Sequence, residues 1–243
     1  MLSPLAIQRP RRTDSINRRA HVWGLLVHTT GSGITAKAKK TKRTPVDVAL
    51  EWYRRSQDGA NGYPWGGPGY VLGHFGELFQ IADDDVWTNH AGGPHRQLYL
   101  SGEWVGRCSA EVVERWRAQW PGVKSPQHLY PSESPNADYV GVEMIPCASG
   151  YGNPMRRGLR FSREQHDQVV ELARDLAARH GWPAGWARTP RLLGHEDVQP
   201  LPFDPKSKKP SYGRSDARGG IDPGWTRADP YFDFEYVRAA LER

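Results

Sequence analysis

Two histidines and an acid further along the chain have side chains that can bind a metal ion. His28 follows the apolar run Val22–Val27, and His195 follows the short segment Arg191–Gly194. Zinc hydrolases hold their ion with a few imidazole or carboxylate ligands and leave one coordination position open for water. A single histidine at the end of a strand is more often structural than a ligand. The residues around each histidine must therefore decide between these two interpretations.

Another residue able to do chemistry, Glu143, lies in a segment with a strand pattern. The sequence Tyr139–Ile145 reads YVGVEMI, and its alternation predicts a strand that places Glu143 on one face or at the strand end. The ordinary alternative is a surface glutamate on an edge strand. An acid between apolar neighbours on an inward strand is less usual, which favours a functional role.

Strand patterns alternate with helix patterns along the chain. Ser162 and Gln165 have the spacing of a capping box, and the apolar positions that follow predict a helix that stops at Gly181. The other expected elements are a strand at Val22–Val27, a helix from Thr44-Pro45 to Gln57, a hairpin of Tyr70–Leu72 with Leu78–Ile81, a helix at Ser109–Trp120 and a C-terminal helix starting at Asp229-Pro230. This order predicts an α/β or α+β fold with a mixed sheet covered by helices, and it leaves the strand order open.

Composition and cysteine content indicate a folded protein that stays in water. Hydrophobic residues make up 37% of the 243 residues, charged residues make up 25%, and the 10 Trp and 10 Tyr are too many for a disordered chain. No run reaches the roughly 18 apolar residues of a membrane span, and the N-terminus lacks the apolar core of a Sec signal. We expect no transmembrane segment and synthesis in the cytoplasm. Cys108 and Cys147 are expected to be unpaired thiols.

The formal charge of +6 comes largely from basic clusters in the chain. These clusters are Arg9–Arg19, Lys37–Arg43 and Lys206–Lys209. They favour a polyanionic partner such as nucleic acid or a bacterial envelope, or they are solvated loops. The sequence contains no nucleic-acid-binding motif, and the basic residues lie in expected loops rather than on one helical stripe. We therefore expect no nucleic-acid partner.

Five short segments occur in the order VHTTG, VWTNHAGG, YVGVEM, LLGHEDV and IDPGW. In this order they resemble the type 2 family of N-acetylmuramoyl-L-alanine amidases, which includes peptidoglycan recognition proteins and phage lysozyme-like amidases. The resemblance covers about residues 20–240. It implies a central mixed β-sheet flanked by helices, with a zinc site at the sheet edge. It also implies a catalytic domain at residues 21–243 that follows a basic extension at residues 1–20.

The resemblance implies a ligand set for Zn²⁺. His28 and His195 match the two histidine ligands, and Asp222 in IDPGW matches the third. Asp204 is the rival third ligand, because it is also followed by proline and lies closer to His195. Glu143 matches the acid that orients or deprotonates the attacking water.

The match also implies substrate contacts, and it shows two departures from the family pattern. His90, Trp87 and Arg218 are the expected substrate-binding residues, and the alternative for His90 and Trp87 is a structural role. Gly220 stands where the family often has a lysine two residues before the third ligand, and Arg218 or Arg214 is the expected substitute. The second departure is the long interval 199–220, which is interpreted as a substrate-specific insertion.

The activity implied is zinc-dependent hydrolysis of the amide between N-acetylmuramic acid and L-alanine in bacterial peptidoglycan. The alternative is a non-catalytic module that binds peptidoglycan. A zincin needs H-E-x-x-H, which His195–Gln199 lacks, and a glycoside hydrolase uses two carboxylates without a metal. We expect action at the cell wall, in the periplasm or on a target envelope. Phage lysis or a secretion machine would deliver the enzyme, and an immunity or delivery partner stays unspecified.

Overall fold

A six-stranded mixed sheet organises the computed structural model, which describes residues 1–9, 18–29, 32–57, 67–88, 90, 96–108, 110–145, 161–198, 200 and 232–243. Its strand order is β1-β4-β3-β5-β2-β6, and only the β3–β4 pair is antiparallel. The strands are β1 (Ile7–Gln8), β2 (Gly24–Thr29), β3 (Tyr70–Leu72), β4 (Leu78–Gln80), β5 (Tyr139–Met144) and β6 (Leu192–Gly194). The expected mixed sheet with flanking helices is confirmed.

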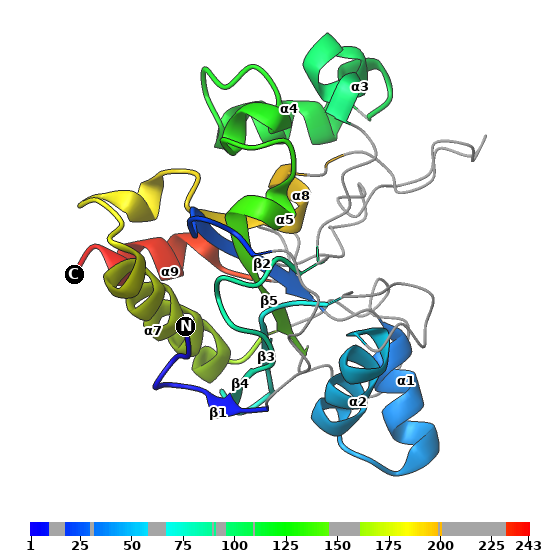
Figure 1. Cartoon of the computed structure of the whole chain (residues 1–243). Helices are drawn as coiled ribbons and strands as arrows, with labels where there is room; N and C mark the ends of the chain where they lie inside the picture. Colours follow the sequence, from blue (N-terminus) through cyan, green and yellow to red (C-terminus); the bar gives the residue numbers. More distant parts are fainter. Residues whose placement is uncertain are drawn as a thin grey trace.

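One face of the sheet packs against the helices α7 (Arg163–His180) and α9 (Phe234–Leu241). Leu25 and Val27 of β2 belong to the same buried cluster as Leu172 of α7 and Val237 of α9. The alternation of a strand sends these side chains to one face and Leu26 and His28 to the other. Figure 1 shows α7 and α9 together on this side of the sheet.

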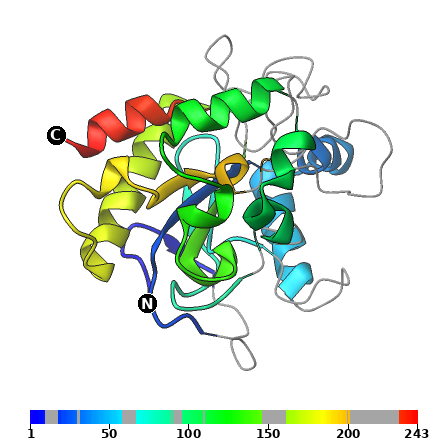
Figure 2. The same cartoon turned by 90° about the horizontal axis from the view of Figure 1, so that it is seen from above.

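Two groups of helices cover the opposite face. The first group is α1 (Ser32–Thr41) and α2 (Pro45–Gln57), and Ala49 and Tyr53 of α2 pack with Val71 of β3. The second group packs around Trp116 and Leu26, next to β2 and β6. It consists of α3 (Arg96–Ser101), η1 (Glu103–Gly106), α4 (Ala110–Gln119), η2 (Pro126–Leu129) and α5 (Pro135–Asp138). Figure 1 shows the two groups apart from each other, whereas they partly overlap in the view from above in Figure 2.

The expected elements are largely confirmed. Helix α7 begins at the predicted capping box of Ser162 and Gln165 and ends at Gly181, whose φ of 62° is a left-handed conformation that glycine adopts without strain. The hairpin, α2, α4 and β5 lie where their patterns place them. Strand β2 starts two residues later than predicted and includes His28.

Two expectations are corrected by the structure. The basic residues Lys37, Lys39 and Lys40 lie on helix α1 and not in a loop, because lysine and alanine favour helix and the buried Ala38 anchors one face. The C-terminal helix α9 begins at Phe234, where the Asp233 side chain accepts a hydrogen bond from the backbone N–H of Tyr236. Asp229-Pro230, the predicted start, lies outside the described residues.

Part of the N-terminal segment belongs to the sheet. Strand β1 pairs in parallel with β4, and the backbone N–H of Ser3 donates to Oε1 of Gln80 at 2.6 Å. Residues 1–9 are thus attached to the sheet, with Ala6 packed against the core and most of the other side chains exposed, while the division at residue 20 stays a prediction. Among the described residues, no helix has the length and apolar character needed to cross a membrane.

Candidate functional site

The pairing of β2 with β6 brings His28 and His195 together. The two strands are parallel, and Val27 is the register partner of Gly194. The residue that follows each of these two in the chain is a histidine, His28 in β2 and His195 directly after β6. Both side chains are fully buried, and their Nδ1 atoms lie 3.0 Å apart. The ring centroids are separated by 4.5 Å. Two residues distant in sequence therefore present ring nitrogens to one point at the carboxyl ends of the strands.

Asp197 fixes the turn that presents His195. Helix α8 (His195–Val198) follows β6 directly, and the buried Asp197 carboxylate accepts from the Gly194 N–H at 2.8 Å and from Nε1–H of Trp120 at 2.9 Å. The carbonyl oxygen of Asp197 accepts from Nε1–H of Trp116 at 2.9 Å. Three hydrogen bonds from buried donors hold this turn, which limits the positions that the His195 ring can take.

His90 lies directly behind His28. Its Nδ1 is 2.9 Å from Nε2 of His28, and its own Nε2 is 3.0 Å from the carbonyl oxygen of Tyr139. Its backbone N–H donates to Oδ1 of Asn136 at 3.0 Å. Burial lowers the pKa of His90 well below its ordinary value, and the nearby His28 and Arg19 lower it further. His90 is therefore neutral at pH 7.

Glu143 stands beside His28 on the neighbouring strand. The two residues are register partners in the parallel β2–β5 pair, so their side chains leave the same face of the sheet. Adjacent strands are about 4.8 Å apart. Glu143 is partly exposed whereas His28 is fully buried. Oε2 of Glu143 is itself buried although the residue as a whole is partly exposed. An acid in this position beside His28 could exchange a proton with a molecule bound there.

The donor set around His28 and His195 fits a zinc ion. Two nitrogens bound tetrahedrally at about 2.0–2.1 Å from one zinc are roughly 3.3 Å apart, close to the observed spacing of the Nδ1 atoms. Asp222, the predicted third ligand, lies outside the described residues, as do Asp204 and Arg218. Within the described ranges, no group of three His, Cys, Asp or Glu side chains could hold a metal. The structure thus shows two of the three predicted ligands together.

Cys108 is no substitute for the third ligand. Burial raises the pKa of its thiol to about 12, and its Sγ donates to the carbonyl oxygen of Pro200 at 3.7 Å. Among the described residues, Cys108 forms no group of three possible metal ligands with His28 and His195. Cys147 and Arg214 lie outside the described residues. Trp87 is partly buried next to Val86, and its predicted contact with substrate is not decided by this position.

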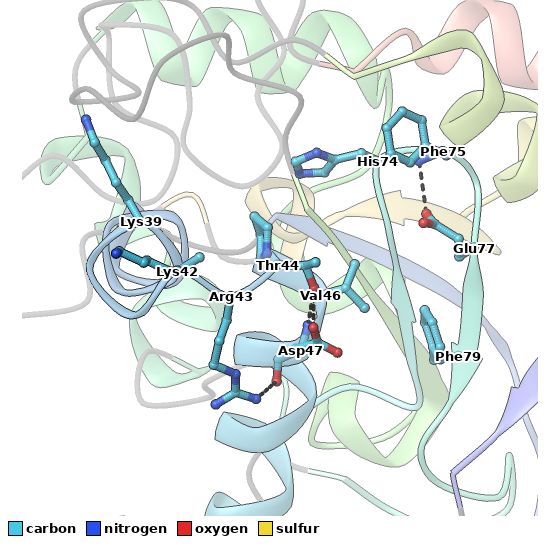
Figure 3. Close-up of a pocket in the computed structure, with 12 residues that line it drawn as sticks. Lys39, Lys42, Arg43, Thr44, Val46, Asp47, His74, Phe75, Glu77 and Phe79 are labelled. Carbon is cyan, nitrogen blue, oxygen red and sulfur yellow. Dashed lines mark hydrogen bonds between the residues drawn. The ribbon is translucent and has the colours of Figure 1, made fainter.

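A cavity of about 710 Å³ opens at the same edge of the sheet, between the α1–α2 turn and the β3–β4 turn (Figure 3). Lys39 and Lys42 line one side, and His74 and the exposed Phe75 line the other. The volume is in the range of small-molecule sites, and the lining also includes Asp47 and Glu77, so it carries charges of both signs beside the aromatic rings. Neither His28 nor His195 lines this cavity.

A family model described as N-acetylmuramoyl-L-alanine amidase matches residues 18–211. The chain belongs to this family. The match spans His28, His90, Glu143 and His195 and ends before Asp222, whose assignment rests on the IDPGW motif. Membership of the N-acetylmuramoyl-L-alanine amidase family supports peptidoglycan amidase activity for the chain. No curated protein sequence matches the chain significantly.

Solved structures of amidases are similar in fold. A selenomethionine derivative of AmpD is 15% identical with a TM-score of 0.50, and the alignment covers 98% of this chain and 95% of that chain. The endolysin amidase LysCS from Clostridium intestinale URNW is 12% identical with a TM-score of 0.40, covering 98% and 97% of the two chains. The amidase LysC from the same organism is 12% identical with a TM-score of 0.40, covering 97% of both chains. At these identities the likeness to AmpD supports the fold alone.

Sequence patterns missed the residues that support the two histidines. Asp197 lies two positions after His195. A carboxylate so close to a predicted ligand could have been recognised as a residue that supports it. The contribution of Tyr139 is a backbone carbonyl, which no side-chain pattern reports. Asn136 lies in α5, a four-residue helix that was not predicted.

Proposed function

We propose that the chain is a zinc-dependent hydrolase of the amide between N-acetylmuramic acid and the L-alanine of peptidoglycan. One observation carries the proposal: in a member of this amidase family, two buried Nδ1 atoms face each other at 3.0 Å, and Glu143 is the register partner of one of the two histidines. The chain contains both histidines and Glu143, whereas a module that only binds peptidoglycan needs none of them for catalysis. Their presence therefore favours catalysis over binding alone.

Three side chains would hold the ion. His28 and His195 would each bind through Nδ1, and Asp222 is proposed as the third ligand. When bound, zinc supplies Lewis-acid chemistry that lowers the pKa of water to about 7 and polarises the scissile carbonyl. Neutral imidazole and carboxylate ligands leave one position open, which is typical of catalytic rather than structural zinc sites.

Glu143 is proposed to move the proton. As a carboxylate it accepts a proton from the attacking water, whose oxygen forms the new bond to the carbonyl carbon. It then donates that proton to the nitrogen of the leaving amine as the carbon–nitrogen bond breaks. The products are a lactyl carboxylate on the glycan and a free amino terminus on the stem peptide. The position of Glu143 beside His28, at the carboxyl end of the neighbouring strand, supports this role.

Substrate contacts are proposed for Trp87 and Arg218. Arg218, or Arg214 in its place, would stabilise the developing negative charge on the carbonyl oxygen, because Gly220 has no side chain to do so. The cavity beside β3 is wide enough for part of a stem peptide. The site of action is proposed to be the bacterial cell wall.

Digestion of purified sacculi tests which bond is cut. The proposed activity releases stem peptides with a free L-alanine amino terminus, which mass spectrometry and amino-terminal labelling detect. New reducing sugar ends without free L-alanine would indicate a glycosidase instead. Sedimentation of the protein with sacculi without any released product would indicate a binding module. The matched control is His195→Ala, which should bind sacculi and release nothing.

A further inference from the structure

The hydrogen bonds behind His28 determine where its ring proton lies. The carbonyl oxygen of Tyr139 can only accept a hydrogen bond, so Nε2 of His90 must carry a hydrogen. A neutral imidazole has one N–H, so Nδ1 of His90 is an acceptor. The only hydrogen that it can accept at this contact comes from Nε2 of His28, 2.9 Å away. Nδ1 of His28 then carries a lone pair.

We propose that His90 is a positioning residue that fixes His28 in the tautomer whose Nδ1 is ready to bind the metal. The inference rests on the proposed function in one respect, namely that Nδ1 of His28 is a zinc ligand. Residues that hold the second nitrogen of a ligating histidine commonly set its tautomer and raise its basicity. Here the support runs from the carbonyl oxygen of Tyr139 on β5, through the ring of His90, to Nε2 of His28.

The surroundings of His90 are built to hold the ring in place. A Cβ on Gly141 would lie 2.7 Å from both Cγ and Nδ1 of His90, so only glycine allows the ring to lie against strand β5. Asn136 holds the backbone of His90, and the side chain is 8% exposed. With both ring nitrogens engaged inside the protein, His90 supports the ligand and does not contact substrate as the family resemblance implied.

The arrangement predicts which histidine changes on metal binding. With the lone pair on Nδ1 of His28, the hydrogen in the 3.0 Å contact between the two Nδ1 atoms belongs to His195. Binding of a metal through Nδ1 of His195 would require that hydrogen to move to Nε2 of the same ring, whereas the tautomer of His28 would stay unchanged.

The tautomers are measured in the metal-free protein by long-range proton–nitrogen correlation NMR with nitrogen-15-labelled histidine. We expect His28 and His90 both to be protonated at Nε2 and His195 at Nδ1. A spectrum in which His28 carries its hydrogen on Nδ1 overturns the proposal. This measurement uses the wild-type chain and does not depend on the folding of any variant.

Zinc affinity of variants provides the second test. His90→Phe keeps a planar ring but removes the acceptor, and we expect the dissociation constant for zinc to rise about 10- to 100-fold in a competition titration. Gly141→Ala, which displaces the His90 ring, should change affinity in the same direction. The matched control is His166→Phe, since His166 is also buried and bonded at both ring nitrogens but belongs to the α7–α9 contact. Unchanged affinity in His90→Phe, or equal loss in the control, overturns the proposal.

Neither readout uses substrate, so the two proposals fail separately. A protein with the predicted tautomers and zinc affinities that leaves sacculi intact contradicts the amidase function alone. An active zinc amidase whose His28 tautomer and zinc affinity do not depend on His90 contradicts this inference alone.

Discussion

The Nδ1 atoms of His28 and His195 lie 3.0 Å apart although 167 positions separate the two residues in the chain. Their proximity follows from the parallel pairing of β2 and β6, which ends both strands at one edge of the sheet. Glu143 reaches the same edge through the parallel pairing of β2 and β5. In open α/β sheets this carboxyl edge is the usual place for a ligand. The pairing of the strands thus brings the three proposed catalytic and metal-binding residues to one edge of the sheet.

Glu143→Gln separates proton transfer from metal binding. The amide keeps the size of the side chain but cannot accept the proton of water, so we expect kcat to fall on the order of 100- to 10,000-fold. The dissociation constant for zinc should stay close to that of the wild type. Steady-state amide hydrolysis and a zinc titration on the same preparation check both values. Loss of zinc from this variant would make Glu143 a ligand and refute its role as the base.

Asp222→Ala and Asp204→Ala decide the third ligand. Pro223 and Gly224 after Asp222 favour a tight turn that holds a carboxylate rigidly. The long interval from His195 costs little in closure entropy, because that cost grows only logarithmically with loop length. We expect Asp222→Ala to weaken zinc binding strongly and Asp204→Ala to leave it nearly unchanged. The reverse pattern in a metal titration transfers the assignment to Asp204.

Asp197→Ala tests the support of the His195 turn. The change leaves the Gly194 N–H and Nε1–H of Trp120 buried without their acceptor, which costs about 1–3 kcal/mol for each group. We expect the free energy of unfolding to fall by about 2–6 kcal/mol in chemical denaturation. The exposed Asp167, which pairs with Arg163, supplies the control: Asp167→Ala should cost less than about 1 kcal/mol. Equal losses in the two variants would show that the Asp197 hydrogen bonds contribute no more to the free energy of unfolding than an exposed ion pair does.

The buried ring of His166 makes the free energy of unfolding depend on pH. Its Nδ1–H donates to the Ser162 carbonyl at 2.7 Å, and its Nε2 accepts from the Asp233 N–H at 2.9 Å, so the folded state needs the neutral ring. Burial lowers the pKa of His166 below its unfolded value of about 6.5. The unfolded chain then binds more protons below that pH, and this contribution to stability is present above about pH 6.5 and lost as the pH falls.

His166→Gln isolates this contribution. Other buried histidines shift in the same direction, so the quantity to read is the difference between the two unfolding free energies at each pH. That difference should shrink from pH 7 to pH 5, because only the wild type loses the His166 contribution. A difference that stays constant over this range would show that His166 does not titrate differently in the folded and unfolded states.

Local patterns predicted most of the elements and the two histidines. The capping box of Ser162 and Gln165, the proline at the start of α2 and the glycines of the hairpin are signals carried by neighbouring residues. Helix α1 was missed because its lysine-rich sequence lacks a strong apolar stripe, and its order depends on packing against α2 and β3. Short motifs in a fixed order singled out His28, Glu143 and His195 as candidates, and the structure places them at one edge of the sheet.

Long-range relationships could not be predicted in the same way. The strand order β1-β4-β3-β5-β2-β6 depends on pairings between distant segments, and it alone explains why His28 meets both Glu143 and His195. The role of His90 depends on a backbone carbonyl of Tyr139 and on the bare Cα of Gly141, which side-chain patterns do not report. Asp222 lies outside the described residues and stays a prediction.

Dependence of amide hydrolysis on bound zinc tests the central claim most directly. Metal-free protein, verified by elemental mass spectrometry, is titrated with zinc while the release of free L-alanine amino termini from sacculi is measured. We expect no release without zinc, a linear rise that ends at one zinc per chain, and no recovery in His195→Ala at any zinc concentration. Full-rate release by the verified metal-free protein would contradict the account.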